Sequence, residues 1–510
     1  MRKWLPLISV CLGTFMLLID VTIANVALPD MVDDLDASFG ALQWVINAYA
    51  LALGALVLGV GSIADLLGHR RVYVVGLAIF ATSSLACGLA PNPGALIAAR
   101  TVQGVGAAAL FATTFALLNS AYVGRDRGSA YGIWGAVSGA SAAVGPILGG
   151  LLTDGASWRW IFFVNLPISA VALAVCVTLL GDPHRPERGG RVDIGGMASF
   201  TAAAAAATYA LIRANGAGWS DAGVWGLLGL AAVLLTVFVL VESRSRHAMF
   251  DLTLLGNRSF VGVLLAGALL TFAAFATFAY TSIWLQSVLG LSAIGAGLTG
   301  LPMSVMAFAV SAVLGRVLHG RRPDLVIGAG LLLVGLGSLL TAVLLRGSAG
   351  WPALVPGLAV IGAGVGLATP ILGSAAMSLV PAVRGGMAGG AVNTARQLGY
   401  AFGVAALGSV FVARAQDSLS GRGIPDADRV AHAVAGGQTN NLLQAAPPDG
   451  RVLLDGATHA AAVTGVQATF AVAGAAGVLA SLLVFVFMRP TGARITQREG
   501  RPSVPQPAGQ

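Results

Sequence analysis

The chain has 510 residues, of which 56% are hydrophobic and 10% are charged, and its mean hydropathy is +0.84. A water-soluble protein of this size could not hide so much apolar surface, so the composition excludes a soluble globular fold. The net charge of +8 does not indicate a nucleic-acid partner, because the basic residues lie mainly in short segments beside apolar runs. These runs are continuous rather than alternating, which excludes a β-barrel and predicts an all-α protein embedded in a lipid bilayer.

About fourteen apolar segments are expected to cross the membrane, each close to the roughly 20 residues that a bilayer core requires. They fall at 5–28, 40–63, 72–90, 95–119, 129–152, 160–180, 194–213, 222–241, 259–287, 293–315, 325–345, 353–380, 386–412 and 463–488. The first run resembles a signal peptide, but it continues to Leu28 without a small-residue cleavage site. We therefore interpret it as a retained first helix.

The connections between these segments alternate in charge. One set is rich in arginine, as at Arg70 and Arg125, whereas the other begins with acidic residues such as Asp30 and Asp33. By the positive-inside rule, the arginine-rich set faces the cytoplasm, and an even number of spans then places both termini there. The expected location is the bacterial inner membrane, with 414–460 as an outer loop and 491–510 as a cytoplasmic tail.

An internal repeat indicates two similar halves. Leu96, Val102, Gly104 and Gly106 recur at the same spacing as Leu354, Val360, Gly362 and Gly364. Parallel repeats of six helices around a central site are a transporter architecture. We therefore predict an N-terminal bundle at 1–181, two inserted linker helices at 182–254 and a C-terminal bundle at 255–490.

Charged residues inside the apolar segments are the first candidates for function, because each costs at least about 2.5 to 3.5 kcal/mol on insertion scales. Asp20, Arg100 and Arg396 are these residues, and Asp20 is the only carboxyl group expected deep within a span. Burial favours a neutral carboxyl and a nearby cation favours a charged one, so Asp20 can bind and release a proton or only hydrogen-bond a neighbouring helix. Arg100 remains charged and either sets the proton affinity of a carboxyl group or bonds to free backbone carbonyls.

Neutral polar residues within the segments are candidates for lining a cargo cavity. Asn393, Arg396 and Gln397 share one face of a predicted helix at one-turn spacing. They fit a face toward a substrate and a packing network equally well. The other candidates are Asn25, Gln43, Asn47 and Gln103.

Two glycine-containing stretches indicate close contacts or sharp turns. The stretch with Gly145, Pro146, Gly149 and Gly150 predicts a small-faced, kinked helix that either slides against the other half or simply packs tightly. The stretch from 61 to 71 joins two predicted spans, and either gates the cytoplasmic side or serves only as a topology signal. In it, glycine permits a turn, Asp65 can contact a cation or a helix N-terminus, and the arginines can contact anionic headgroups. Its candidate residues are Gly61, Asp65, Gly68, Arg70 and Arg71.

The sequence gives no sign of a metal, a cofactor or an enzyme active site. Its six histidines lack ligand spacing, and there is no phosphate-binding Gly-x4-Gly-Lys-Ser/Thr sequence. ATP is therefore not the expected energy source, and the expected source is the proton gradient that a carboxyl group such as Asp20 could use. The expected partners are a small-molecule substrate and the bilayer, with a monomer as the functional unit.

Together these stretches resemble the major facilitator superfamily, and specifically its fourteen-span drug:proton antiporter branch. The matching segments are 18–29, 61–71, 100–106, 145–150, 158–167 and 393–399. The resemblance implies that Arg100 takes part in proton transfer, that 61–71 is a cytoplasmic gating loop and that 145–150 is an antiporter motif. Leu66 and His69 replace basic residues of the loop motif, so gating is looser or another arginine such as Arg127 substitutes. Asn47 stands where the branch often has aspartate.

The function expected from these features is proton-driven export of a drug or antibiotic-like molecule. Asp20 would carry the proton, and a single carrier predicts one proton per cycle and favours a neutral or zwitterionic cargo. An exporter or importer of an endogenous metabolite on the same scaffold is the alternative, because fold alone does not fix function. A membrane enzyme or receptor would need a catalytic cluster or a sensory domain, and the sequence contains neither.

Overall fold

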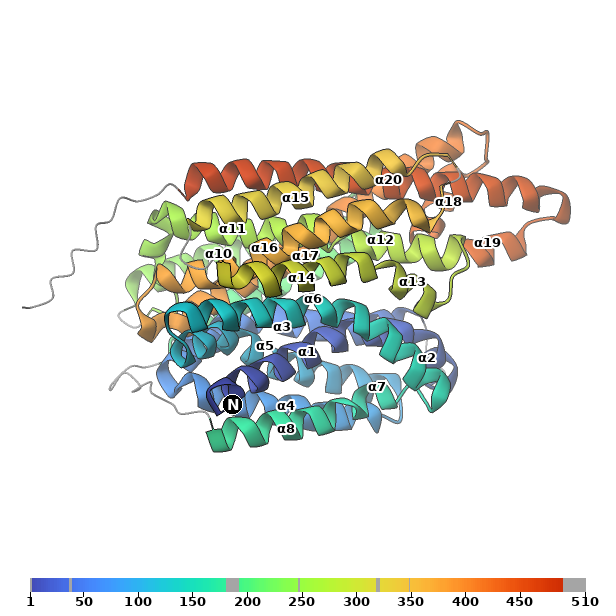
Figure 1. Cartoon of the computed structure of the whole chain (residues 1–510). Helices are drawn as coiled ribbons and strands as arrows, with labels where there is room; N and C mark the ends of the chain where they lie inside the picture. The colour runs from blue at the N-terminus through green and yellow to red at the C-terminus, as the bar shows by residue number, and fades with distance from the viewer. Residues whose placement is uncertain are drawn as a thin grey trace, which may run out of the picture.

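The computed structural model describes residues 2–35, 39–179, 192–245, 248–317, 322–347 and 349–488, and within these ranges the chain is helical without strands. Long helices run side by side in two groups, one from each half of the chain (Figure 1). The first group consists of α1 (Leu5–Val26), α3 (Phe39–Leu67), α4 (His69–Gly88), α5 (Pro93–Ala121), α6 (Gly124–Gly155) and α8 (Asn165–Leu179), with the short α2 (Leu28–Leu35) and α7 (Trp160–Phe163).

The second group is formed by the C-terminal half. It consists of α11 (Arg258–Ala274), α12 (Thr277–Ile283), the π-helical turn η3 (Trp284–Val288), α13 (Ala293–Thr299), α14 (Leu301–Val317), α15 (Pro323–Leu344), α16 (Val355–Ser378), α17 (Gly385–Ser420) and α20 (Pro448–Phe487). Short 3-10 turns lie at Arg2–Trp4, Leu252–Gly256, Trp351–Leu354 and Ala382–Arg384.

Twelve helices in the described ranges are long and apolar enough to cross a membrane. They correspond to twelve of the predicted segments. The two other segments are also helical: 129–152 lies within α6, whereas 293–315 is divided at Gly300 into α13 and α14, whose apolar part is Leu301–Leu314. The helices thus confirm a polytopic membrane protein, and the exact number of spans stays a prediction.

The inserted segment forms a helical hairpin of α9 (Ile194–Ala217) and α10 (Ala222–Arg244). An aspartate caps each helix: Asp193 Oδ1 accepts from Gly196 N at 2.7 Å, and Asp221 Oδ1 accepts from Val224 N at 3.1 Å. Helix α9 packs on α10, α3 and α17, whereas only 17% of the α10 span is buried. Apolar residues cover the exposed surface of α10, as expected for a helix that faces lipid.

The segment 414–460, which we expected to be an outer loop, is mostly helical. Helix α17 continues to Ser420, α18 (Ala427–Ala435) and α19 (Thr439–Ala445) follow, and α20 begins at Pro448. At 40 residues, α20 is about 60 Å long, about twice the thickness of a bilayer core. This end of α20 and the short helices project beyond the remaining helix ends (Figure 1). The position of the segment outside the membrane stays a prediction.

The two groups meet along two helix pairs, α3 with α17 and α6 with α14. A β-carbon on Gly61 would lie 2.3 Å from the carbonyl oxygen of Gly386, so a residue with a side chain could not occupy this crossing. In the second pair, Ser311 Oγ donates to the Gly132 carbonyl at 3.0 Å, and a β-carbon on Gly139 would lie 3.0 Å from Ala307 Cβ. Backbone-to-backbone approach therefore brings the halves together.

Candidate functional site

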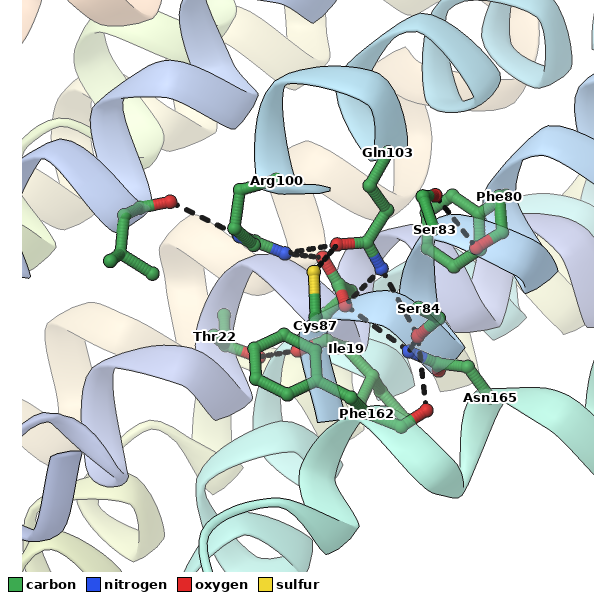
Figure 2. A network of polar contacts seen from close by, with 12 residues as sticks. Ile19, Thr22, Phe80, Ser83, Ser84, Cys87, Arg100, Gln103, Phe162 and Asn165 are labelled. Atoms are coloured by element: carbon green, nitrogen blue, oxygen red, sulfur yellow. Dashed lines mark hydrogen bonds and ion pairs between the residues drawn. The ribbon is translucent and has the colours of Figure 1, made fainter. Parts of the chain in front are cut away.

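Asp20 and Arg100 form an ion pair inside the N-terminal group, between α1 and α5. Both side chains are fully buried, and Arg100 Nη1 donates to Asp20 Oδ2. Figure 2 shows the surrounding side chains converging from α4, α5, α7 and α8. The structure thus brings together the two residues that the sequence singled out as proton carrier and partner.

Two amides complete the surroundings of the carboxylate. Asp20 Oδ1 accepts from Gln103 Nε2 at 3.0 Å and from Asn165 Nδ2 at 3.2 Å. Ser84 joins them, because its hydroxyl oxygen accepts from Asn165 at 3.0 Å and from Gln103 at 3.3 Å (Figure 2). These donors replace water around a charge that has been removed from solvent.

The guanidinium of Arg100 is held on several sides. Nε donates to the Val45 carbonyl at 3.1 Å, and Nη1 donates also to Gln103 Oε1 at 2.8 Å. The Tyr49 ring lies 4.4 Å from the guanidinium carbon. Nη2 is buried without a partner, so one donor is available to another acceptor. Both alternatives for Arg100, the carboxyl partner and the backbone carbonyl, are therefore present at once.

Asn165 and Ser84 were not selected as site residues from the sequence. Asn165 belongs to the 158–167 segment of the family resemblance, which was the available signal, whereas Ser84 had none. Asn47 is half-buried on α3 and is not a hydrogen-bond partner of Asp20 or Arg100. The side chains of Asn25 and Gln43 lie outside the part of the chain that the structure describes.

The polar face of α17 lies where the two groups meet. Asn393 Nδ2 donates to the Phe111 carbonyl of α5 at 2.9 Å, and Gln397 Cβ is 3.7 Å from the position of a β-carbon on Gly54. Arg396 is half-buried, and its Nη1 reaches Asn393 Oδ1 only at 3.5 Å. Its Nε is buried without a partner, and no ion pair to a described carboxylate is formed. Asn393 therefore acts in packing between the groups, whereas Arg396 retains free donor capacity.

Asp65 fastens the end of α3 to the start of α17. Its Oδ1 accepts from Gly386 N at 2.6 Å and its Oδ2 from Met387 N at 2.7 Å, while His69 Nε2 lies 2.8 Å from Oδ1. Arg384, the residue before α17, provides no side-chain cap, so Asp65 caps this N-terminus from the other half. We call this contact the latch.

The remaining residues of the 61–71 stretch have different roles. Gly68 has φ of +98°, which favours glycine, and it directly precedes α4. Arg70 donates to the carbonyls of Cys176 at 3.2 Å and Val177 at 2.6 Å, so it fixes the end of α8, whereas Arg71 is exposed. Arg127 donates to the carbonyls of Tyr122 and Asn119. Among the described contacts, His69 is a basic group at Asp65, and a substituting arginine stays a prediction.

The 145–150 stretch lies inside α6 and contacts both halves. A β-carbon on Gly145 would come within 1.8 Å of Thr22 Oγ1 on α1, and one on Gly150 within 2.4 Å of Ile294 on α13. Gly149 is buried, and Pro146 is part of the same continuous helix. Gly145 thus packs α6 within the N-terminal group, whereas Gly150 packs it against the other half.

An ion pair outside the predicted spans links α2 to the segment before α7. Arg159 Nη1 and Trp158 Nε1 donate to Asp34 Oδ2, and Arg159 Nη2 donates to the Ala90 carbonyl at 3.2 Å. These hydrogen bonds, that of Arg159 first, lower the pKa of Asp34 below its usual value. No group of three or more potential metal ligands occurs in the described ranges.

The sequence matches the Major Facilitator Superfamily over residues 10–404. It is 36% identical to the multidrug resistance protein Stp of Mycobacterium tuberculosis, covering 83% of this chain and 79% of that protein. It is also 36% identical to the puromycin resistance protein pur8 of Streptomyces alboniger, covering 85% and 87%. The fold resembles that of the human organic anion transporter MFSD10 (TETRAN), with a TM-score of 0.65, 15% identity and coverage of 94% and 99%. The chain belongs to the major facilitator superfamily.

Proposed function

We propose that this protein is a proton-coupled antiporter that exports a drug or antibiotic-like small molecule across the bacterial plasma membrane. Family membership makes it a membrane transporter, and the names of its relatives concern multidrug and puromycin resistance. The observation that carries proton coupling is the fully buried pair of Asp20 and Arg100. Such a charged pair inside a bilayer is expensive to retain unless it has a function.

In this mechanism Asp20 exchanges its proton while its surroundings change. In the described state, its oxygens are occupied by Arg100, Gln103 and Asn165. Protonation neutralises the carboxyl group and weakens the attraction of Arg100, which frees the guanidinium for other acceptors. Since Arg100 stays charged, only Asp20 of this pair can carry the proton.

Alternation would take place between the two helix groups. The latch holds α3 to α17, so we propose that this end is closed in the described state and that transport requires Asp65 to leave the start of α17. The tight contact of Gly150 on α6 with Ile294 on α13 would act as the pivot. Alternating access by movement of one repeat against the other is the general behaviour of this architecture.

The topology that completes the proposal has about fourteen spans, with α6 and the pair α13 and α14 in addition to the twelve apolar helices. It places both termini in the cytoplasm and the latch on the cytoplasmic side. The functional unit would be a monomer, with Arg396 and Gln397 facing the cargo. One proton crossing about 150 mV supplies about 3.5 kcal/mol, enough for a cargo gradient of a few hundredfold.

The test is transport by purified protein in sealed liposomes, with puromycin as the first cargo in a panel of antibiotics. An imposed pH difference should drive uptake, and Asp20→Asn should reduce this pH-driven rate by at least about 100-fold because the proton carrier is gone. The reduction should occur without unfolding, as checked by the melting temperature. Asp417→Asn is the matched control, because Asp417 is an exposed helical carboxylate.

Wild-type rates in Asp20→Asn would exclude Asp20 as the carrier. Uphill movement of cargo with no pH or voltage difference would exclude proton coupling altogether. Inside-out vesicles decide the direction, since an acidic lumen should draw cargo inward through an exporter. The opposite direction would identify an importer.

A further inference from the structure

A second buried carboxyl group occurs in the inserted hairpin. Glu242, near the end of α10, is 4% exposed, although Asp20 was the only deep carboxyl expected from the sequence. The apolar segment predicted from the sequence ends at residue 241, just before Glu242. Asp324 is buried as well, but it pairs with Arg322 at 2.6 Å, whereas Glu242 forms no ion pair with a described residue.

Glu242 lies against Asp193, the N-cap of α9. Glu242 Oε1 and Asp193 Oδ2 are 2.6 and 3.0 Å from one point, the position that a β-carbon on Gly196 would occupy. The absence of a side chain at Gly196 therefore allows two carboxyl groups to approach each other across the hairpin.

One oxygen of each group is satisfied and the other is not. Glu242 Oε1 accepts from Phe250 N at 3.3 Å, and Asp193 Oδ1 accepts from Gly196 N. Glu242 Oε2 and Asp193 Oδ2 are buried without a partner. Two ionised carboxylates in this arrangement would repel each other and leave two acceptors unsatisfied away from water. A proton on one group lowers both costs, because it cancels one charge and provides one donor.

Among the described residues, the charged groups on the neighbouring elements do not compensate the pair. Arg244, on α10 itself, and Arg258, at the start of α11, are exposed. Asp251 is 2.5 Å from Arg384, so that arginine is already engaged. On α3 and α4, Asp65 and His69 contact each other within the latch.

We propose that Glu242 and Asp193 form a second proton-binding site, in which the two carboxyl groups share one proton. This site is separate from Asp20 and does not depend on the proposed export function. Its ligand is the proton, since the described part of the pair offers two carboxyl groups and not the larger oxygen shell that a metal cation requires.

The site is connected to the latch through consecutive short contacts. Glu242 accepts from Phe250 N, and the next residue, Asp251, contacts Arg384 with its carboxylate and Met387 Sδ with its backbone N–H at 3.5 Å. Met387 N in turn donates to Asp65. A β-carbon on Gly59 of α3 would lie within 3.7 Å of both Met197 and Met249, so the hairpin also packs directly beside the latch. Loss of the proton would thus alter the segment that positions the start of α17.

Infrared spectroscopy of the purified full-length protein tests this site without any cargo. The unsubstituted protein should show the carbonyl stretch of a protonated carboxyl group at neutral pH, and Glu242→Gln should remove the intensity of about one such group. Asp193→Asn retains the N-cap acceptor, and it should weaken the same band at neutral pH because the repulsion that favours the proton is gone. Asp221→Asn is the control, since Asp221 caps α10 but pairs with Arg213.

Unchanged bands in both Glu242→Gln and Asp193→Asn would overturn the proposal. If the band disappears on addition of sodium chloride but not of choline chloride, the site binds a sodium ion instead of a proton. This result would also overturn the proposal. If Glu242→Gln does not fold, Asp193→Asn decides the outcome. Because no transport is measured, these results do not depend on Asp20 or on the identity of the cargo.

Discussion

The two arginines inside the bilayer region have opposite surroundings. Arg100, in the N-terminal group, contacts a carboxylate, an amide oxygen, a backbone carbonyl and an aromatic ring. The Arg396 side chain, in the C-terminal group, forms one described hydrogen bond, to Asn393 at 3.5 Å, and its Nε has no partner. The two halves therefore provide different numbers of hydrogen-bond acceptors to a buried guanidinium group.

This difference suggests different roles for the two arginines in our proposal: one at the proton site and one at the cargo. Removing a guanidinium from water costs several kcal/mol unless acceptors inside the protein compensate it. For Arg100 the protein provides acceptors for Nε and Nη1 and leaves only Nη2 unpaired, which makes the N-terminal group nearly self-contained as a site for a proton. For Arg396 the described residues provide only Asn393 Oδ1 at 3.5 Å, so the acceptor that offsets its charge in our proposal is the cargo. A neutral or zwitterionic cargo with an acceptor oxygen meets this need without a second proton carrier.

Arg100→Gln should give the largest loss of stability. Removing one partner of a buried ion pair leaves Asp20 uncompensated and typically costs about 3 to 5 kcal/mol. The melting temperature of the purified protein measures the loss. Arg100→Lys should lose less stability but still turn over more slowly, because an ammonium group cannot reproduce the planar contacts to Asp20, Gln103 and Val45. Full turnover in Arg100→Lys would make Arg100 a purely structural residue.

Asp65→Asn should have an intermediate effect, which is to weaken the contact between α3 and α17 at the junction of the halves. The amide retains an acceptor but loses the charge that caps α17, which is worth about 1 to 2 kcal/mol. The latch should therefore open more often. Leu58 on α3 is buried, and its Cα lies 3.1 Å from the position of a β-carbon on Gly390 of α17, so a cysteine placed there should react about tenfold faster with a water-soluble thiol reagent. The same cysteine in an Asp34→Asn background is the control, because Asp34 caps nothing on α17. Equal rates in both backgrounds would show that the latch does not hold the halves together.

The sequence could predict most of the helices and the Asp20 and Arg100 pair, because long apolar runs and charges within them are strong signals. It could not predict Asn165 and Ser84 as partners, since neutral polar residues are inexpensive in a helix and occur throughout the chain. The burial of Glu242 could not be predicted, because it lies just beyond an apolar run, where charged side chains are usually exposed to water. Only the three-dimensional packing against Asp193 and Phe250 shows that it is buried.

The latch illustrates a different limit of sequence reasoning. The 61–71 stretch predicted that Asp65 would contact a cation or a helix N-terminus, and the structure confirms the helix. Which helix it contacts depends on the close approach of Gly61 to Gly386, residues far apart in the chain. No local pattern contains that pairing, so the partner could be found only from the fold.

Arg396→Gln should have the smallest effect on stability and a selective effect on cargo. Because Arg396 has no ion pair to lose, the melting temperature should stay equal or rise, in contrast to Arg100→Gln. The cargo concentration for half-maximal transport should rise about tenfold, which corresponds to one lost charge-assisted hydrogen bond. Asn393→Ala is the matched control one turn away, since it breaks the contact with Phe111 and should lower stability instead. A drop in melting temperature for Arg396→Gln, with unchanged cargo affinity, would mean that Arg396 is satisfied within the protein and that the two arginines do the same structural work after all.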